Sequence, residues 1–523
     1  MNPGARPIGS RFDRRSLLAR SAAVATAVAL TGSPAGALAR GGTRRPGLLP
    51  DAKTIAARGL HPADLGLVQA AALLRTGKLS SRELTEACLD RIEQRDEPVN
   101  GWIRVYAERA LAAADSADRR MRGGAPGSLL VGLPIGLKDI YAVRGELLTA
   151  SSKILAGNRP DADSRAWSRL DRAGAVLVGH TETHEFAAGN FTPQSANPWD
   201  RSRTPGGSSG GSAIALAARM IPAATGSDTF GSLRIPASFC GLTTIKPTQG
   251  LVSTGGLIPL AESLDTAGPI ARSAKDVALL LSYMAPRLDR DRLYLRRPRR
   301  GRKPLAGKRI GIPDQTFGDL EPEPSIAARV ESFAGELQGL GATLVPFAAP
   351  RSKADNLSSP DGFRFFLEVP CAEVDAYHRQ WFPQRSDDYS QDVVTLLTLA
   401  RAANTPAHDP EPGRQTIRAL RQAWLDAFTS ARLDAVLQPA ALIEPPDRDE
   451  AAMKTQQIGD PMVVWNYTGF PAMCLPAGPS KATGLPVGVQ LIGRPGSDRK
   501  LLRIGIDAQH HHPHHRLHPT AYR

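Results

Sequence analysis

Cysteine is scarce in this chain, and its spacing excludes several kinds of site. The 523 residues include four cysteines, Cys88, Cys240, Cys371 and Cys474, which lie far apart. No CxxC pair occurs, so the sequence indicates neither a zinc site nor a disulfide framework. Cys240 is interpreted as a small buried hydrophobic residue.

Long hydrophobic runs are also missing. A short apolar run lies near the N-terminus at residues 21–31, but it is too short to span a bilayer. It follows DRRSLL at 13–18, which resembles a twin-arginine motif, and precedes ALA at 37–39, which has the form of a signal-peptidase site. We therefore predict a twin-arginine-type signal peptide over 1–39 and export to the periplasm or the medium, with a mature start near Arg40. A disordered basic tail is the alternative.

Acidic residues are outnumbered by basic ones, which gives a formal net charge of +14. The excess is concentrated in the first 20 residues and in a Pro- and Gly-containing stretch at 296–303. Basic runs can bind anions or nucleic acid. No aromatic residues are interleaved with the second run as a stacking platform requires. We interpret residues 286–308 as a solvated linker and expect no nucleic-acid partner.

The length and the alternation of patterns predict one large enzyme fold of the α/β class. From about Ala63 to Arg120 the pattern is helical, and Ser80 with Glu83 forms a capping-box signature. Beyond it, helical patterns alternate with short apolar runs that are typical of strands. These segments lie at 129–137, 166–178, 310–345 and 415–437. We expect a large mixed central β-sheet flanked by α-helices.

Two later stretches give weaker predictions. Residues 465–472 are interpreted as a turn that leads to a central strand at 484–493. Residues 349–412 have an irregular pattern with scattered aromatic and charged residues. We expect the part from about 350 to 430 to form helical excursions around a substrate entrance.

Glycine and serine gather in one stretch, Gly206 to Thr248, which carries the features of a reactive site. It begins with GGSSGGS and passes through an Ala-rich helical run. It then reaches a second turn, DTFGS at 228–232, followed by Arg234. Glycines let the backbone approach a substrate closely. A turn of this kind can direct consecutive backbone N–H groups at a developing oxyanion.

A lysine lies in the apolar run GLPIGLKD at 132–139. Burial of the Lys138 ammonium is costly unless its pKa falls or the group is paired. A surface lysine at the end of a strand is the alternative interpretation.

Together these stretches resemble the amidase signature family, serine hydrolases that cleave carboxylic amides with a Ser-cisSer-Lys triad. Further matching segments lie at 183–187, 197–199, 265–272 and 484–493. The resemblance implies an amidase domain at 63–508, preceded by a mobile segment at 40–62. Its signature core spans about 130–285, its variable substrate-side part about 309–430, and a His-rich tail at 509–523 follows.

The resemblance implies a role for each triad position. Ser232 corresponds to the nucleophile, and Ser208, 24 residues earlier, to the serine after a cis peptide bond. Lys138 corresponds to the catalytic lysine, which must be neutral to act as a base. Protons would pass from the Ser232 hydroxyl through Ser208 to the Lys138 amine, and back to the leaving amine.

Other residues have implied supporting roles. The backbone N–H groups of Thr229, Phe230, Gly231 and Ser232 are expected to form the oxyanion hole. Ser209 is expected to support the hydroxyl network. Asp228 and Arg234 are expected to hold the turn by charge-assisted hydrogen bonds, with an ordinary surface pair as the alternative.

Phe230 departs from the family pattern, which commonly has glycine at this position. The backbone N–H remains after such a change, so an oxyanion donor is not lost. The aromatic ring is expected to narrow or line the acyl pocket, and therefore to affect the range of substrates.

The implied reaction is hydrolysis of a linear carboxylic amide to a carboxylate and ammonia or an amine through an acyl-enzyme on serine. No cofactor and no metal are expected. A small-molecule amide and a peptide amide both remain possible substrates, and the oligomeric state is open. Six histidines between His510 and His518 could collect a metal ion, although no acidic or thiolate partners accompany them.

Four alternatives remain open. One is an amidotransferase A-type subunit that acts on charged tRNA, which shares the fold. Another is an α/β-hydrolase-type esterase, because GGSSG at 206–210 fits the pattern G-x-S-x-G. The polar residues 200–205, which end in proline, do not favour the strand that this motif requires. Phosphate binding at the N-terminus of the following helix and a non-catalytic binding relative are the other two.

Overall fold

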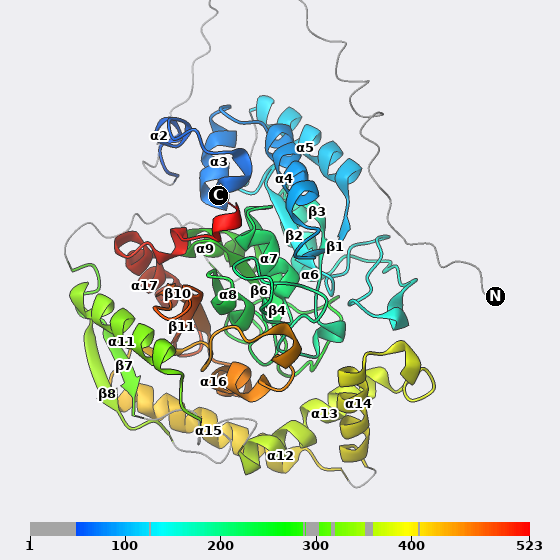
Figure 1. Cartoon of the computed structure of the whole chain (residues 1–523), viewed down its shortest axis with the longest axis vertical. Coiled ribbons are helices and arrows are strands. Elements are labelled where there is room, and N and C mark those ends of the chain that lie inside the picture. The colour runs from blue at the N-terminus through cyan, green and yellow to red at the C-terminus, as the bar shows by residue number, and fades with distance from the viewer. Residues whose placement is uncertain are drawn as a thin grey trace, which may run out of the picture. The chain divides into compact units, whose positions relative to one another are not determined.

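A mixed sheet of 11 strands runs through the described part of the chain (Figure 1). The computed structural model describes residues 49–124, 127–285, 288, 303–314, 320–350, 359–405 and 408–522. The strands are β1 (Trp102–Val105), β2 (Pro134–Lys138), β3 (Val176–Thr181), β4 (Ala223–Asp228), β5 (Thr243–Lys246), β6 (Thr266–Ala271), β7 (Arg309–Pro313), β8 (Thr343–Phe347), β9 (Ala435–Pro439), β10 (Ala472–Pro479) and β11 (Pro486–Ile492). Their order across the sheet is β1-β3-β2-β4-β6-β5-β10-β11-β9-β7-β8.

Strand direction changes across the sheet. Strands β3, β2 and β4 are parallel neighbours, and so are β9, β7 and β8. The strands between these two groups pair in antiparallel fashion. Strand β1 is antiparallel to β3 at one edge. The predicted α/β fold with a large mixed sheet flanked by helices is therefore confirmed.

Helices surround the central sheet and pack on its strands (Figure 1). They are α2 (Ala52–Ala56), α3 (Leu67–Arg75), α4 (Ser81–Arg95), α5 (Ala107–Arg122), α6 (Arg165–Arg172), α7 (Gly210–Ala217), α8 (Arg234–Phe239), α9 (Ala274–Met284), α11 (Pro324–Gly339), α12 (Pro360–Glu368), α13 (Pro370–His378), α14 (Gln391–Ala403), α15 (Glu411–Ser430), α16 (Thr455–Tyr467) and α17 (Asp498–His511). Helices α7, α8 and α9 are almost entirely buried because their residues are mainly small or aliphatic.

Helix α4 begins where the sequence predicts, and a strand interrupts the helical region that contains it. The Ser80 N–H donates to Glu83 Oε2 over 2.7 Å, and the Glu83 N–H donates to Ser80 Oγ over 3.0 Å. This capping box begins α4 and is confirmed. The expectation of helix throughout 63–120 is wrong at β1, which pairs with β3. Trp102 at the start of β1 buries its indole and directs Nε1 at Met220 Sδ over 3.3 Å.

One other expectation about local structure is corrected, while the helices expected within 349–412 are present. Residues 465–467 belong to helix α16, and only the following residues turn before β10 begins at Ala472. Pro461 lies inside α16 and masks the helical pattern in the sequence. Helices α12, α13 and α14 occupy much of 349–412, where the sequence pattern is irregular.

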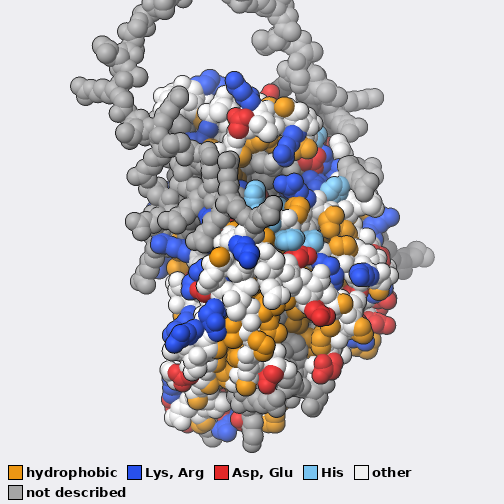
Figure 2. Space-filling view, turned by 90° about the vertical axis from the view of Figure 1, so that its left-hand side faces the viewer, with side chains coloured by type: hydrophobic (Ala, Val, Ile, Leu, Met, Phe, Trp, Pro, Cys, Tyr) orange, Lys and Arg blue, Asp and Glu red, His pale blue; other side chains and the backbone are white. Residues whose placement is uncertain are grey.

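Strand β8 forms the edge of the sheet on the side that Figure 2 shows, where hydrophobic side chains lie among charged ones. Pro346 on β8 is exposed and has no N–H with which to bind a further strand. In the described ranges, no helix is both long and apolar enough to cross a membrane. The predicted signal peptide and most of the predicted basic linker lie outside the described residues.

Candidate active site

Three strand ends meet at one edge of the sheet and bring the candidate residues together. Lys138 is the last residue of β2, and Asp228 is the last residue of the parallel neighbour β4. Strand β6 runs antiparallel to β4, with Thr266 opposite Asp228, so Asp265 lies at the same edge. Ligand sites in α/β sheets form at such carboxyl ends of parallel strands.

Lys138 is fully buried and directs its amine at two hydroxyl groups. Its Nζ lies 2.7 Å from Ser208 Oγ and 2.8 Å from Ser227 Oγ. Burial lowers the pKa of Lys138 to about 7, and the nearby carboxylates of Asp265 and Asp228 oppose this shift. The alternative of a surface lysine is therefore wrong. An amine with such a pKa is about half neutral at pH 7, whereas an ordinary lysine is almost fully charged there.

The loop that carries Ser208 leaves no room for side chains. The peptide bond between Gly207 and Ser208 is cis, as the resemblance implies. A Cβ atom on Gly207 would lie 2.1 Å from the carbonyl oxygen of Phe191. Ser208 itself is fully buried. Close contact with the main chain at Phe191 therefore requires glycine at 207 and places the Ser208 hydroxyl beside Lys138.

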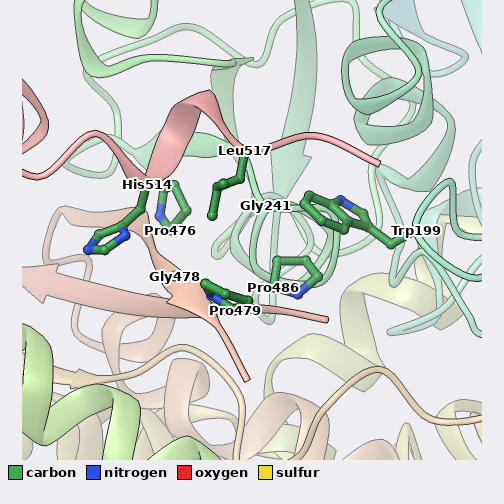
Figure 3. Close-up of a pocket in the computed structure, with 8 residues that line it drawn as sticks. All are labelled: Trp199, Gly241, Pro476, Gly478, Pro479, Pro486, His514 and Leu517. Atoms are coloured by element: carbon green, nitrogen blue, oxygen red, sulfur yellow. The ribbon is translucent and has the colours of Figure 1, made fainter. Parts of the chain in front are cut away.

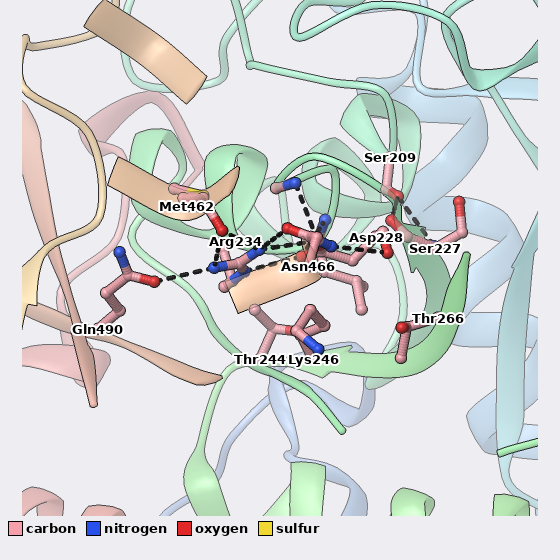
Figure 4. Close-up of polar contacts among 12 residues, drawn as sticks. Ser209, Ser227, Asp228, Arg234, Thr244, Lys246, Thr266, Met462, Asn466 and Gln490 are labelled. Atoms are coloured by element: carbon pink, nitrogen blue, oxygen red, sulfur yellow. Dashed lines mark hydrogen bonds and ion pairs between the residues drawn. The ribbon is translucent and has the colours of Figure 1, made fainter. Parts of the chain in front are cut away.

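Ser209 contacts main chain rather than other hydroxyl groups. Its Oγ lies 3.3 Å from both the N–H and the carbonyl oxygen of Ser227 (Figure 4). Its own N–H donates to the carbonyl oxygen of Ser232 over 3.2 Å. The expectation that Ser209 supports the hydroxyl network stays a prediction. Ser209 ties the Ser208 loop to the end of β4 and to the segment of Ser232.

Ser232 lies four residues after β4 and two before α8, and its side chain is almost completely buried. The structure places its main chain against Ser209, next to the Ser208–Lys138 pair. The proton transfer between the Ser232 and Ser208 hydroxyls stays a prediction.

The turn after β4 offers fewer oxyanion donors than expected. The Gly231 N–H donates to Asp228 Oδ1 over 2.9 Å, so it already has an acceptor. The N–H groups of Thr229, Phe230 and Ser232 have no recorded acceptor among the described residues. These three amides stay candidates for the oxyanion hole. Gly231 has a φ of +110°, a conformation that favours glycine.

Asp228 and Arg234 form a fully buried ion pair that holds this turn (Figure 4). Arg234 donates from Nε to Asp228 Oδ2 and from its terminal nitrogen to Oδ1, both over 2.9 Å. Asn466 of α16 donates to Asp228 Oδ1 over 2.7 Å, and Gln490 of β11 accepts from Arg234 over 3.0 Å. The alternative of an ordinary surface pair is wrong.

The Asp228 carboxylate stays charged near neutral pH. Burial opposes ionisation of Asp228, but Arg234 and the Asn466 hydrogen bond hold its pKa down at about 2. A carboxylate that stays charged keeps its bonds to Arg234 and to the Gly231 N–H. The turn is therefore preorganised by electrostatic contacts that need no movement during a reaction.

Comparison with known proteins identifies the family of the chain. A model of the Amidase family matches residues 83–502 of the chain. The chain belongs to the amidase signature family. The A-type subunit of glutamyl-tRNA(Gln) amidotransferase from Chloroflexus aggregans is 36% identical over 466 residues, which cover 83% of this chain and 93% of that protein.

Solved structures of this family share the fold. An amidase structure superposes with a TM-score of 0.74 and 27% identity, over 85% of this chain and 99% of the other. The native peptide amidase from Stenotrophomonas maltophilia superposes with a TM-score of 0.71 and 29% identity, over 85% and 96% of the two chains. The amidase signature fold therefore covers nearly all of the described residues.

The amidase signature site also contains residues that the sequence did not single out. Ser227 contacts the Lys138 amine, and Asn466 contacts Asp228 from 238 positions away. Thr229 Oγ1 donates to Asp265 Oδ1. The Asp265 carboxylate also raises the pKa of Lys138, so this residue connects the turn with the lysine. The only sequence signal for Asp265 is its place at the start of the matching segment 265–272. Asn466 has no such signal.

A second buried lysine lies beneath the Asp228–Arg234 pair (Figure 4). Burial, aided by the charge of Arg234, lowers the pKa of Lys246 to about 7. Its Nζ donates to the carbonyl oxygen of Pro247 over 3.2 Å, and among the described residues no hydroxyl group is recorded beside it. Lys246 therefore shares the burial of Lys138 but not its serine partners.

His184, a histidine that an α/β-hydrolase site could use, is engaged elsewhere. No strand precedes Gly206 in the described segment 182–209, so the G-x-S-x-G interpretation lacks its strand. His184 directs Nε2 at Asp392 Oδ2 over 2.5 Å and Nδ1 at the Glu185 carbonyl oxygen over 3.2 Å. Neither ring nitrogen of His184 is left to activate a serine.

A separate small apolar pocket has neither Lys138 nor a serine in its lining (Figure 3). It is lined by Trp199, Gly241, Pro476, Gly478, Pro479, Pro486, His514 and Leu517. The titratable residue among them, His514, has its Nε2 2.9 Å from Glu336 Oε1. This pocket contains no nucleophile, so we assign it no part in the chemistry.

The His-rich tail packs against the amidase signature fold. Helix α17 extends to His511, and His512 and His514 both lie next to Glu336 of α11. Arg95 of α4 donates to the Tyr522 carbonyl oxygen over 3.2 Å. Within the described ranges, no group of three or more histidine, cysteine or acidic side chains is arranged to hold a metal ion.

Proposed function

We propose that this protein hydrolyses a linear carboxylic amide to a carboxylate and ammonia or an amine through an acyl-enzyme on Ser232. One observation carries the proposal. A fully buried lysine with a lowered pKa contacts the hydroxyl of Ser208 over 2.7 Å, directly beside the segment of Ser232. Membership of the amidase signature family supports the same reaction class.

In the proposed mechanism, the Ser232 hydroxyl attacks the amide carbon while its proton passes through Ser208 Oγ to the neutral Lys138 amine. The N–H groups of the turn stabilise the negative charge on the carbonyl oxygen. The proton then returns along the same path to the leaving nitrogen, and the C–N bond breaks. Water, deprotonated by the same path, hydrolyses the ester on Ser232 and releases the carboxylate.

The test labels the nucleophile before any substrate is known. A fluorophosphonate should attach to Ser232, as peptide mapping by mass spectrometry will show, and Ser232→Ala should remove the label. On any amide that the wild type cleaves, Ser232→Ala should lower kcat by about 10⁴-fold or more, and Lys138→Ala by about 10²- to 10⁴-fold.

The matched control is Ser332→Ala, which alters an exposed serine on α11. It should keep both the label and the turnover. Unchanged turnover in Ser232→Ala, or a label on another serine, would contradict the assignment.

A second candidate function comes from the curated relatives. Several are A-type subunits of glutamyl-tRNA(Gln) amidotransferases, with 35–37% identity to this chain. If the chain is an amidotransferase component of this kind, it should copurify with partner subunits, and its release of ammonia from glutamine should depend on charged tRNA. Hydrolysis of simple amides by the isolated chain favours the first proposal.

We further propose that the protein is exported through a twin-arginine pathway. The support is the DRRSLL sequence at 13–18, the apolar run at 21–31 and the ALA sequence at 37–39. N-terminal sequencing of secreted material should find a start near Arg40.

A further inference from the structure

Phe230 is the point at which the reactive segment reaches solvent. From Thr204 to Pro247 every residue is buried except Arg219 and Phe230. Arg219 contacts Asp64, away from the serines. Phe230 lies between Thr229 and Gly231 in the turn that leads to Ser232. Phe230 is therefore the partly exposed residue of this segment that lies nearest in sequence to Ser232.

The ring of Phe230 continues into a row of aromatic side chains on α12. Phe366 lies edge-on to it, with ring centroids 5.8 Å apart and an angle of 65° between planes. Phe363 stacks on Phe366, with centroids 6.3 Å apart and an angle of 25°, and is 45% exposed. These three residues, here called the aromatic wall, extend from the turn to the surface.

The wall is supported from behind by the fold. Tyr467 of α16 lies edge-on to Phe230 with centroids 6.3 Å apart, and Phe365 packs edge-on against Tyr467 with centroids 4.6 Å apart. Both supporting side chains are buried. Phe230 also packs against both large hydrophobic clusters of the core. The ring is thus fixed in place, and its accessible part can serve as a contact surface.

Such a wall distinguishes substrates by polarity. An aryl or arylalkyl group gains from removal of apolar surface from water and from edge-to-face or offset contacts with the rings. A polar group held against the same surface loses its water without a replacement hydrogen bond. Glutamine carries a charged amine and carboxylate on its acyl side, and small aliphatic amides have little apolar surface to place against the rings.

We propose that the aromatic wall selects amides whose acyl group is aromatic or arylalkyl, in preference to glutamine and to short aliphatic amides. The proposal rests on the proposed function, because it concerns the same serine. In primary amides the leaving group is always ammonia. Differences in kcat/KM among them therefore come from the acyl group alone.

The first experiment compares kcat/KM for phenylacetamide, propionamide and glutamine. The wild type should prefer phenylacetamide to propionamide by about 100-fold, as a pocket that fits a large apolar group can achieve. Phe230→Gly and Phe366→Ala should each lower this ratio by about tenfold, and Phe230→Leu should lower it less. Phe333→Leu, which removes a buried ring on α11, is the matched control and should leave the ratio unchanged.

The second experiment does not depend on amide turnover. Phenylmethanesulfonyl fluoride and methanesulfonyl fluoride both sulfonylate a reactive serine, and only the first carries a ring. Wild type should react at Ser232 faster with the aryl reagent, and Phe366→Ala, whose melting temperature is checked first, should lose most of that preference.

The outcomes separate the two proposals. Equal labelling by both reagents, or an unchanged preference in Phe230→Gly and Phe366→Ala, overturns the aromatic wall while the nucleophile stands. Preference for glutamine overturns it as well. Failure of both reagents to label Ser232 contradicts the proposed function itself.

Discussion

At the scale of single residues, the protonation of one buried amine sets the pH range of the site. Burial lowers the pKa of Lys138 to about 7. Only the neutral amine can accept the proton of a serine, so the active fraction rises as pH rises through this value. We expect kcat/KM to increase about tenfold per pH unit below pH 7 and to level off above it. A flat profile between pH 5 and 8 contradicts this role for Lys138.

Asp265 provides a second prediction at this scale. Its charge raises the pKa of Lys138, against the larger effect of burial. Asp265→Asn keeps an oxygen that can accept from Thr229 but removes the charge. We expect the rising limb of the pH profile to move to lower pH, because the neutral amine is then favoured.

The control for this experiment is Glu262→Gln, which removes an exposed carboxylate from the same loop and should leave the limb in place. If Asp265 has only a structural role, Asp265→Asn should lower kcat/KM at every pH without moving the rising limb of the pH profile. A limb that moved to higher pH would contradict the proposed electrostatic link.

At the scale of elements, one carboxylate fastens the start of α14 to the signature core. Glu185 Oε2 accepts hydrogen bonds from the Ser390 N–H over 2.7 Å and from its hydroxyl over 2.5 Å. A negative charge at a helix N-terminus is also favourable. Next to it, Phe186 packs edge-on against His378 of α13 with ring centroids 4.5 Å apart. These contacts attach α13 and α14 to the core.

Glu185→Gln should loosen this attachment. Loss of charge-assisted hydrogen bonds of about 1.5–3 kcal/mol should speed amide hydrogen exchange in α14 by about 10- to 100-fold. Hydrogen-exchange mass spectrometry measures this directly. Asp387→Asn alters an exposed residue in the loop before α14 and should leave the hydrogen exchange of α14 unchanged. Equal exchange in α14 of both variants would show that Glu185 does not fasten the helix.

Elements differ in how well the sequence predicts them. Helix α4 is evident because Ser80 and Glu83 form a local capping box, whose two hydrogen bonds need no distant partner. Strand β1 is hidden because four residues between two helices have little pattern of their own, and its pairing with β3 defines it. Helix α16 is hidden because Pro461 interrupts the local signal, while burial of its residues from Ile458 to Tyr467 stabilises it.

At the scale of the whole molecule, buried lysines couple stability to pH. The pKa of Lys246 is about 7 in the folded state and about 10.4 in an unfolded chain. Between pH 7 and 9 the unfolded state therefore binds a proton that the folded state lacks. The free energy of unfolding must then rise with pH over this range, by at most about 1.4 kcal/mol per pH unit from this residue.

Lys246→Met removes this contribution. We expect the free energy of unfolding of the wild type, relative to the variant, to rise from pH 7 to pH 9 in urea titrations. Lys481→Met alters an exposed lysine in the turn before β11 and should follow the wild type at each pH. Parallel pH curves for the wild type and Lys246→Met would contradict the folded-state pKa.

The sequence alone determined the family, the mixed α/β architecture and the candidate triad positions, because these depend on local spacing and on long matching segments. Only the tertiary structure decided which groups meet. It placed Lys138 in full burial beside Ser208, engaged the Gly231 N–H with Asp228, and brought Asn466 of α16 to the same carboxylate. These contacts join residues on separate strands and helices. The pairing of strands across the sheet brings these residues together, and no local sequence pattern indicates that pairing.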